Sequence, residues 1–162
     1  MGLRLVAHYF ENKDDLLAQA FARLLDDVGE ATAEASRKVH TPAEKLKAIF
    51  STIFSNAVYS RVARLAYLAF WAASLTNPAL LKINKAAYLR FHASVEGLFE
   101  RAAREKRIEI DARAAAIGII GLSDGLWLDL SIGVDGFTRD NAVSACLDFI
   151  DGILQGRRAK RG

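Results

Sequence analysis

Aromatic and polar side chains recur at helical spacing in three separate stretches of the sequence, and their types are those that recognise a positive charge. The faces of tyrosine and tryptophan rings attract cations, and a carboxylate in apolar surroundings must find a partner. The candidate ligand-binding residues are Tyr67, Phe70, Trp71, Tyr88, Phe91, Asp124 and Trp127. We interpret them as an aromatic wall, with Asp124 as the counter-charge for a cationic or amphipathic small molecule.

A plainer interpretation of the same residues stays open. Aromatic residues at helical spacing often form the core, and Asp124 would then pair with an arginine or make a polar contact between helices. Gly118, Gly121 and Gly125 recur at intervals of three and four residues. Such spacing removes side chains from one helix face, which favours the close approach of another helix or leaves room for a ligand.

Patterns for catalysis and metal binding are weak. His8, His40 and His92 have no cysteine or carboxylate at metal-ligand spacing, and no glycine-rich loop follows a strand. The acid pairs at 14–15 and 26–27 lie on helix faces predicted to be exposed, without a second acid cluster to match them. We therefore predict no catalytic residue, no metal site and no cofactor, and a protein that is not an enzyme.

Length and composition limit the class of protein further. The chain has 162 residues, 52% of them hydrophobic, which suits one domain with a substantial core. Four of the 22 basic residues lie in the last seven positions, so the rest is near neutral and residues 157–162 are predicted to be a disordered basic tail. A single cysteine, no signal-peptide pattern and no uncharged stretch long enough for a membrane span predict a soluble, cytoplasmic protein.

Apolar residues recur every three or four positions along nearly the whole chain, and no alternating strand pattern competes with them. Helix start signals divide this pattern into segments. These signals are Asn12, the capping box Thr41-Pro42-Ala43-Glu44, Asn77-Pro78, Asp111 and Thr138. The predicted helices cover about residues 13–37, 42 onward, 61–75, 78–106, 112–132 and 139–155. The sequence therefore predicts an all-α bundle of six long helices.

The stretch from residue 5 to residue 17 carries His8-Tyr9-Phe10, a short turn, Lys13, an acid and two leucines. It resembles the junction in TetR-family transcriptional regulators where the recognition helix ends and a long connecting helix begins. This resemblance implies DNA contacts by His8, Tyr9 and Lys13. It also places Met1 within the recognition helix, so residues 1–12 would be a remnant of the helix-turn-helix domain, and operator binding is expected only if the preceding helices are present.

Residues 68–74 and 124–128 resemble the ligand domain of one branch of that family, the BetI-like regulators of choline and glycine-betaine genes. The resemblance implies that residues 13–156 form an effector-binding and dimerisation domain. The function implied is that of a transcriptional regulator, expected to be a repressor, whose DNA binding a small-molecule effector releases or alters. The alternative is a ligand-binding dimer without DNA binding, either a decoy or a truncated gene product.

The last predicted helix carries two apolar stripes, whereas a helix on the surface of a monomer needs only one. In the TetR family the last two helices pair with their copies in a second subunit, so the resemblance implies a homodimer formed through these helices. The residues assigned to this interface are Val143, Cys146, Leu147, Ile150 and Leu154.

Overall fold

The structure is a computed structural model that describes residues 13–156, with side chains from residue 15 onward. Over these residues the chain forms six helices and no strand. The helices are α2 (Lys13–Arg37), α3 (Pro42–Ile53), α4 (Arg61–Ser74), α5 (Pro78–Lys106), α6 (Ala112–Ile132) and α7 (Arg139–Leu154). The predicted all-α bundle of six helices is confirmed, with most helix ends within one residue of the predicted ones.

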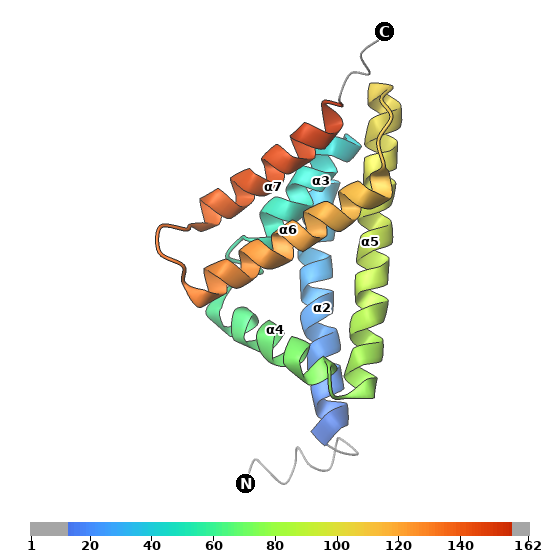
Figure 1. Ribbon diagram of the computed structural model, residues 1–162. Helices are drawn as coiled ribbons and strands as arrows, with labels where there is room; N and C mark the ends of the chain where they lie inside the picture. Colours follow the sequence, from blue (N-terminus) through green and yellow to red (C-terminus); the bar gives the residue numbers. More distant parts are fainter. Residues whose placement is uncertain (1–12, 157–162) are drawn as a thin grey trace.

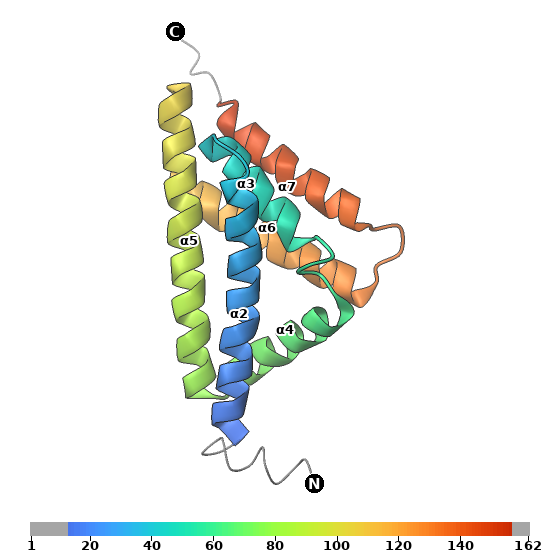
Figure 2. The ribbon, with the colours of Figure 1, turned by 180° about the vertical axis from the view of Figure 1, so that it is seen from behind.

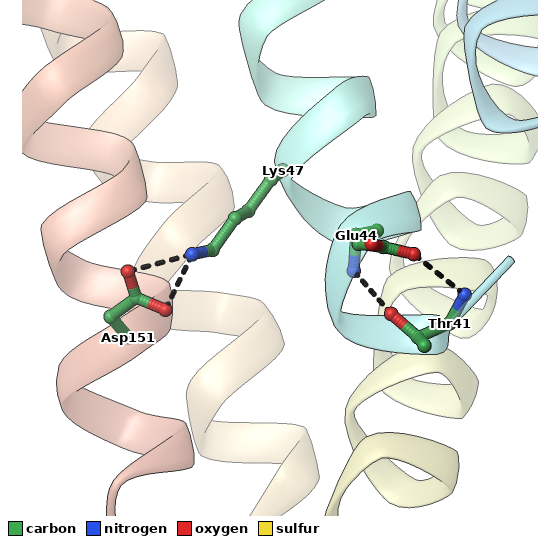
Figure 3. Close-up of polar contacts among 4 residues, drawn as sticks. All are labelled: Thr41, Glu44, Lys47 and Asp151. Carbon is green, nitrogen blue, oxygen red and sulfur yellow. Dashed lines mark hydrogen bonds and ion pairs between the residues drawn. The ribbon is translucent and has the colours of Figure 1, made fainter. Parts of the chain in front are cut away.

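The helices begin where the sequence supplies capping side chains. Thr41 accepts a hydrogen bond from the Glu44 backbone N–H, and the Glu44 carboxylate accepts one from the Thr41 backbone N–H (Figure 3). This reciprocal pair satisfies two of the amide groups that the first turn of a helix leaves free. The other described start residues that cap with a side chain are Ser60, Asn77, Asp111 and Thr138.

Two long helices, α2 and α5, run side by side along the height of the molecule (Figures 1 and 2). The helix α4 lies across the end of the molecule at which both α2 and α5 begin (Figure 1). At the other end α3 and α7 pack together, and α6 crosses between the two ends (Figure 1). The Lys47 ammonium of α3 lies 2.7 Å from the Asp151 carboxylate of α7, so an ion pair ties these two helices together (Figure 3).

The buried side chains form two separate clusters. The upper cluster, named for the end of the molecule at which α3 and α7 pack together in Figure 1, joins α3, α5, α6 and α7 and includes Phe50, Phe99, Ile119, Cys146 and Ile150. The lower cluster is much smaller and consists of Phe21 of α2, Phe70 of α4 and Leu80 of α5. Half-buried residues such as Leu25 and Ile83 surround it. The first half of α2 is therefore held by a small group of contacts that is distinct from the main core.

By length and composition alone, α6 is the one described helix that could cross a membrane. Asp124 and Asp129 interrupt its apolar run, so its uncharged stretches are shorter than a membrane span requires. Its residues Ile119, Ile120 and Trp127 are buried inside the bundle, against α5 and α7. A core helix of a soluble bundle has the same composition.

Candidate functional site

A cavity of about 950 Å³ lies between α2, α4, α5 and α6. Its volume falls in the range of small-molecule sites, about 300–1,000 Å³. It borders both clusters, because Tyr88 and Phe91 pack on the upper cluster and Leu25 packs on the lower one. Six of the seven predicted ligand residues line it: Tyr67, Trp71, Tyr88, Phe91, Asp124 and Trp127.

Three of these aromatic rings touch one another and form one wall of the cavity. The Tyr67 ring lies 5.6 Å from that of Trp127 and 6.4 Å from that of Trp71, measured between ring centroids. The two tryptophan rings are 6.0 Å apart. The interplanar angles of 54 to 80° make these tilted and edge-to-face contacts, which aromatic rings prefer. The three rings therefore support one another through these contacts.

Asp124 of α6 lies beside this wall and accepts a hydrogen bond from the Tyr88 hydroxyl of α5, with the two oxygens 3.2 Å apart. Burial raises the pKa of Asp124 to about 6, although the hydrogen bond from Tyr88 acts in the opposite direction. Burial and then the charge of Asp124 raise the pKa of Tyr67 to about 12. The same two causes raise the pKa of Tyr88 above its ordinary value. The carboxylate is thus partly desolvated, and it has no positive partner within residues 15–156.

In the part of the chain that the structure describes, the ion pairs join other residues, and none involves Asp124. The pairing of Asp124 with an arginine, one of the alternatives above, is not found there. The polar contact between helices is found, since Tyr88 belongs to α5 and Asp124 to α6. Tyr88 is neutral at physiological pH, so this contact leaves the negative charge of an ionised Asp124 uncompensated.

The cavity opens to solvent along α2. The acids Asp26, Asp27, Glu30 and Glu34 line this opening and are exposed, as are the two basic lining residues Arg37 and Arg90. Charges of both signs in water contribute little to selectivity because solvent screens them. Among the described lining residues, Asp124 is the one charged group that is not exposed.

The prediction for Phe70 was wrong in its location. Phe70 lies in the lower cluster, where its ring stacks on that of Phe21 with centroids 4.5 Å apart, and it does not line the cavity. Successive residues of a helix are turned by about 100° from one another, so Trp71 faces the cavity while Phe70 faces α2 and α5. The sequence predicts that the two residues lie on adjoining faces of the helix, but it does not show which face meets the cavity and which meets α2 and α5.

The interface assignment also needs correction. Cys146, Ile150 and Leu154 are buried inside the protomer, in the upper cluster. Val143 is half-buried against this cluster, and Leu147 is half-buried. The second stripe of α7 has a partner within the chain, because α7 packs against both α3 and α6. Exposed apolar residues lie on α6 instead, where Ile117 is 55% and Ile132 is 69% exposed.

The predicted DNA contacts cannot be placed. His8 and Tyr9 lie outside the described residues, and Lys13 begins α2 with a side chain that also lies outside them. Their role in DNA binding stays a prediction. Among the described residues, no group of three or more histidine, cysteine, aspartate or glutamate side chains is arranged to hold a metal ion. Burial raises the pKa of the Cys146 thiol to about 11.

Sequence reasoning missed one residue behind the aromatic wall. Tyr59, in the connection between α3 and α4, is buried, and its ring meets that of Trp127 edge to face at 5.4 Å. The guanidinium groups of Arg64 and Arg139 lie 5.1 and 5.8 Å from the centre of the Tyr59 ring. No helical periodicity covers a residue in a connection, so only its aromatic type and its position before the Ser60 cap could have drawn attention to it.

The fold is a helical bundle with a cavity whose volume suits a small molecule. Residues 42–155 match the family described as the C-terminal domain of BetI-type transcriptional repressors. The chain is 30% identical over 154 residues to the HTH-type transcriptional regulator BetI of Serratia proteamaculans, covering 94% of this chain and 76% of that protein. It is 32% identical over 149 residues to BetI of Pseudomonas aeruginosa, covering 91% and 74%.

Solved structures show the same fold. A putative transcriptional regulator from Pseudomonas aeruginosa PAO1 superposes with a TM-score of 0.85 at 27% identity, covering 96% of this chain and 76% of that one. A putative transcriptional regulator from Saccharomonospora viridis, solved in complex with choline, superposes with a TM-score of 0.81 at 19% identity, covering 91% and 78%. The chain belongs to the family of BetI-type transcriptional repressors, which are TetR-like regulators.

This membership confirms the resemblance stated from the sequence. The chain is a transcriptional regulator of the TetR family, and the alternative of a ligand-binding dimer without DNA binding is not favoured. The relatives are bacterial transcriptional regulators and not enzymes. Regulators of this family typically dimerise and bind small-molecule effectors.

Proposed function

We propose that residues 13–156 form the effector-binding and dimerisation domain of a repressor whose effector is a small organic cation. The single observation that carries the proposal is the Asp124 carboxylate, which is partly desolvated at the edge of an aromatic wall and, among the described residues, has only a neutral hydroxyl as its partner. A cation placed there would gain both a counter-charge and ring faces. Choline, which the regulator from Saccharomonospora viridis binds, has this chemistry.

The residues proposed to hold the cation are Tyr67, Trp71, Tyr88 and Trp127, with Asp124 as counter-charge and Phe91 as apolar lining. The cavity is larger than choline requires, because about 300–1,000 Å³ suits a drug-sized ligand. The effector therefore carries apolar bulk beyond the charged group, or shares the cavity with water. Choline, tetramethylammonium and benzyltrimethylammonium form a series that distinguishes these two cases.

The experiment is a calorimetric titration of these three cations into the wild type and into Asp124→Asn. We expect the substitution to weaken binding by about tenfold or more, because it removes the charge and keeps the shape. Asp129→Asn is the matched control, since Asp129 is an exposed acid on the same helix. Equal affinity of the wild type and Asp124→Asn would contradict the proposal, and so would a wild type that binds none of the three cations.

We further propose a homodimer formed through the outer face of α6 together with the exposed side of α7. Exposed residues of α6 that share this face include Ile117, Gly121, Gly125, Leu128 and Ile132. Such a contiguous apolar strip is unusual on the surface of a monomer, and a two-fold axis would cover it in both subunits at once. Val143 and Leu147, half-buried in the protomer, lie on the helix beside it.

Sedimentation analysis tests this interface. The double variant Ile117→Glu/Ile132→Glu should shift the protein from dimer to monomer, because it places charges in a desolvated contact. Leu89→Glu is the matched control, because Leu89 is 71% exposed but lies on α5. A double variant that stays dimeric would place the interface elsewhere.

DNA contacts by His8, Tyr9 and Lys13 are the remaining part of the proposal, and they imply a cytoplasmic protein. A lysine at the start of a helix suits a phosphate, because the helix N-terminus and the ammonium both attract the anion. Gel-shift titration of the full-length regulator with the DNA upstream of its own gene tests this assignment. Lys13→Ala should weaken binding and reduce its salt dependence, whereas an unchanged salt slope would reject the assignment.

A further inference from the structure

Tyr59 and Arg64 form a structural support behind the ligand wall. The Tyr59 ring meets Trp127 at 5.4 Å with an interplanar angle of 87°, and the Tyr59 hydroxyl lies 3.2 Å from the Ser131 hydroxyl. The same tyrosine hydroxyl donates to the Trp127 carbonyl at 3.4 Å. Tyr59 therefore contacts both the ring and the backbone of Trp127.

Tyr59 is itself fixed in place. Its backbone N–H donates to the Ser55 carbonyl at 2.7 Å, within the turn that connects α3 and α4. The Arg64 guanidinium lies 5.1 Å from the centre of its ring, and that of Arg139 lies 5.8 Å away while bonding to Asn56. Both distances are within the range of a cation–π contact.

Arg64 also contacts α6 directly. Its Nη1 donates to the Leu130 carbonyl at 3.5 Å, which is one of the last carbonyls of α6 and has no partner further along the helix. A cation at this end of a helix is further favoured by the helix dipole. Arg64 thus connects α4 to the end of α6 next to Trp127.

This arrangement is more specific than packing requires. An apolar side chain could cover the Tyr59 ring without desolvating a charge, yet the half-buried Arg64 lies beside it, and the Arg64 Nε is buried without a hydrogen-bond partner among the described residues; the second guanidinium, that of Arg139, is exposed. Replacing buried charges by apolar groups is often neutral or stabilising. A planar guanidinium can hold the Tyr59 ring in one orientation, whereas an apolar group would cover the ring without fixing its orientation.

We propose that Arg64 is a positioning residue for ligand recognition, which acts through Tyr59 to hold the Trp127 ring in the orientation that the effector meets. The proposal rests on the proposed function, because it assumes that Trp127 contacts the effector. Neither Arg64 nor Tyr59 lines the cavity. Their effect on binding is therefore indirect.

The sign of the effect separates positioning from simple electrostatics. Arg64 carries a positive charge near a site proposed for a cation, so loss of this charge alone would tighten cation binding. Loss of positioning would weaken it, because the Trp127 ring would become mobile and the ligand would have to order it. Arg64→Gln should therefore weaken choline binding about three- to tenfold, against the electrostatic expectation.

A second readout does not depend on any ligand. Trp71 and Trp127 are the two tryptophans of the chain, so Trp71→Phe leaves Trp127 as the sole fluorophore. In this background we expect Arg64→Gln to reduce the near-ultraviolet circular dichroism of Trp127 by about half. Acrylamide quenching of its fluorescence should rise about twofold. Arg64→Lys keeps the charge but not the planar group, and should lie between the wild type and Arg64→Gln in both signals.

Arg61→Gln is the matched control, since Arg61 is an exposed arginine at the start of the same helix. If Arg64→Gln gives the same tryptophan signals as Arg61→Gln, the positioning role is rejected. Tighter choline binding by Arg64→Gln would also reject it and leave only the electrostatic effect. If no cation binds the wild type but the tryptophan signals change as expected, the support of Trp127 stands and the proposed cationic effector fails. Should Arg64→Gln not fold, Arg64→Lys and Tyr59→Phe carry the same test.

Discussion

The ring of Phe21 on α2 stacks on the ring of Phe70 on α4, with centroids 4.5 Å apart and planes inclined by 24°. Phe70 directly precedes Trp71, which lines the cavity. A displacement of α4 by an effector would therefore reach the first half of α2 through this aromatic contact and the apolar residues packed around it. Such coupling requires that the effector bind one arrangement of α4 and α2 better than the other.

Phe21→Ala and Phe70→Ala should each lower the free energy of unfolding by about 3 kcal/mol, since each empties a buried ring site. The double variant should lose less than the sum, because a stacked pair contributes about 0.5–1.5 kcal/mol beyond its burial. Urea denaturation of the wild type, the two single variants and the double variant gives this coupling energy. Strict additivity would show that the two rings are neighbours without an energetic link.

Asp124→Asn should stabilise the fold at neutral pH. The pKa of Asp124 is raised from 3.8 to about 6, so the folded state holds its proton more tightly than the unfolded chain does. The carboxylate then destabilises the fold increasingly between about pH 4 and pH 6, and the full penalty, on the order of 3 kcal/mol, persists above that range. Asparagine carries no charge and its carbonyl can still accept the Tyr88 hydrogen bond.

Urea denaturation at about pH 4 and pH 7.5 checks this expectation. The stability difference between Asp124→Asn and the wild type should appear at the higher pH and vanish at the lower. Asp129→Asn, on the exposed side of α6, should follow the wild type at both. A wild type that is more stable than Asp124→Asn at neutral pH would mean that the charge has a favourable partner.

Choline binding should weaken as the pH falls through about 6, because the pKa of Asp124 lies there and the protonated acid offers no counter-charge. At about pH 5 the affinity should be roughly tenfold lower than at about pH 7.5. Calorimetric titration across this range measures the profile. In Asp124→Asn the affinity should be low and independent of pH. A wild-type affinity that does not change near pH 6 would show that choline does not use the Asp124 carboxylate as its counter-charge.

Gly118→Ala should be less stable than a matched glycine substitution. A Cβ at position 118 would stand 2.7 Å from Cζ of Phe149, so the phenyl ring of α7 would have to move. At Gly29 of α2 a Cβ would meet no atom within 4 Å. Both changes gain helix propensity, so the difference, about 1–2 kcal/mol in thermal or urea unfolding, reports the clash alone. Phe149→Ala should abolish the difference.

The sequence was sufficient for the helices because their start signals are local. Thr41 with Glu44, and Asn77 with Pro78, act on the turn that follows them, whatever packs around it. Six of the seven predicted ligand residues line one cavity, because aromatic residues and one acid on central helices have few other positions in a bundle.

The errors arose where the rotation of a helix relative to its neighbours decides the outcome. Phe70 and Trp71 are adjacent in sequence, yet one faces α2 and the other the cavity. Cys146, Ile150 and Leu154 were assigned to a second subunit because the sequence does not show that α7 packs between α3 and α6. Tyr59 was missed because the structure of a connection depends on the helices it joins.

The helix α5 spans 29 residues without interruption, about 40 Å, from Leu80 in the lower cluster to Phe99 in the upper one. Tyr88 and Phe91 lie between these points and line the cavity. Because one continuous rod joins all three regions, the distance between two probes at its ends should be the same with and without effector. Any change of distance from such a probe to α2 or α4 then measures the motion of α2 or α4 alone, which makes α5 an internal ruler for the switch.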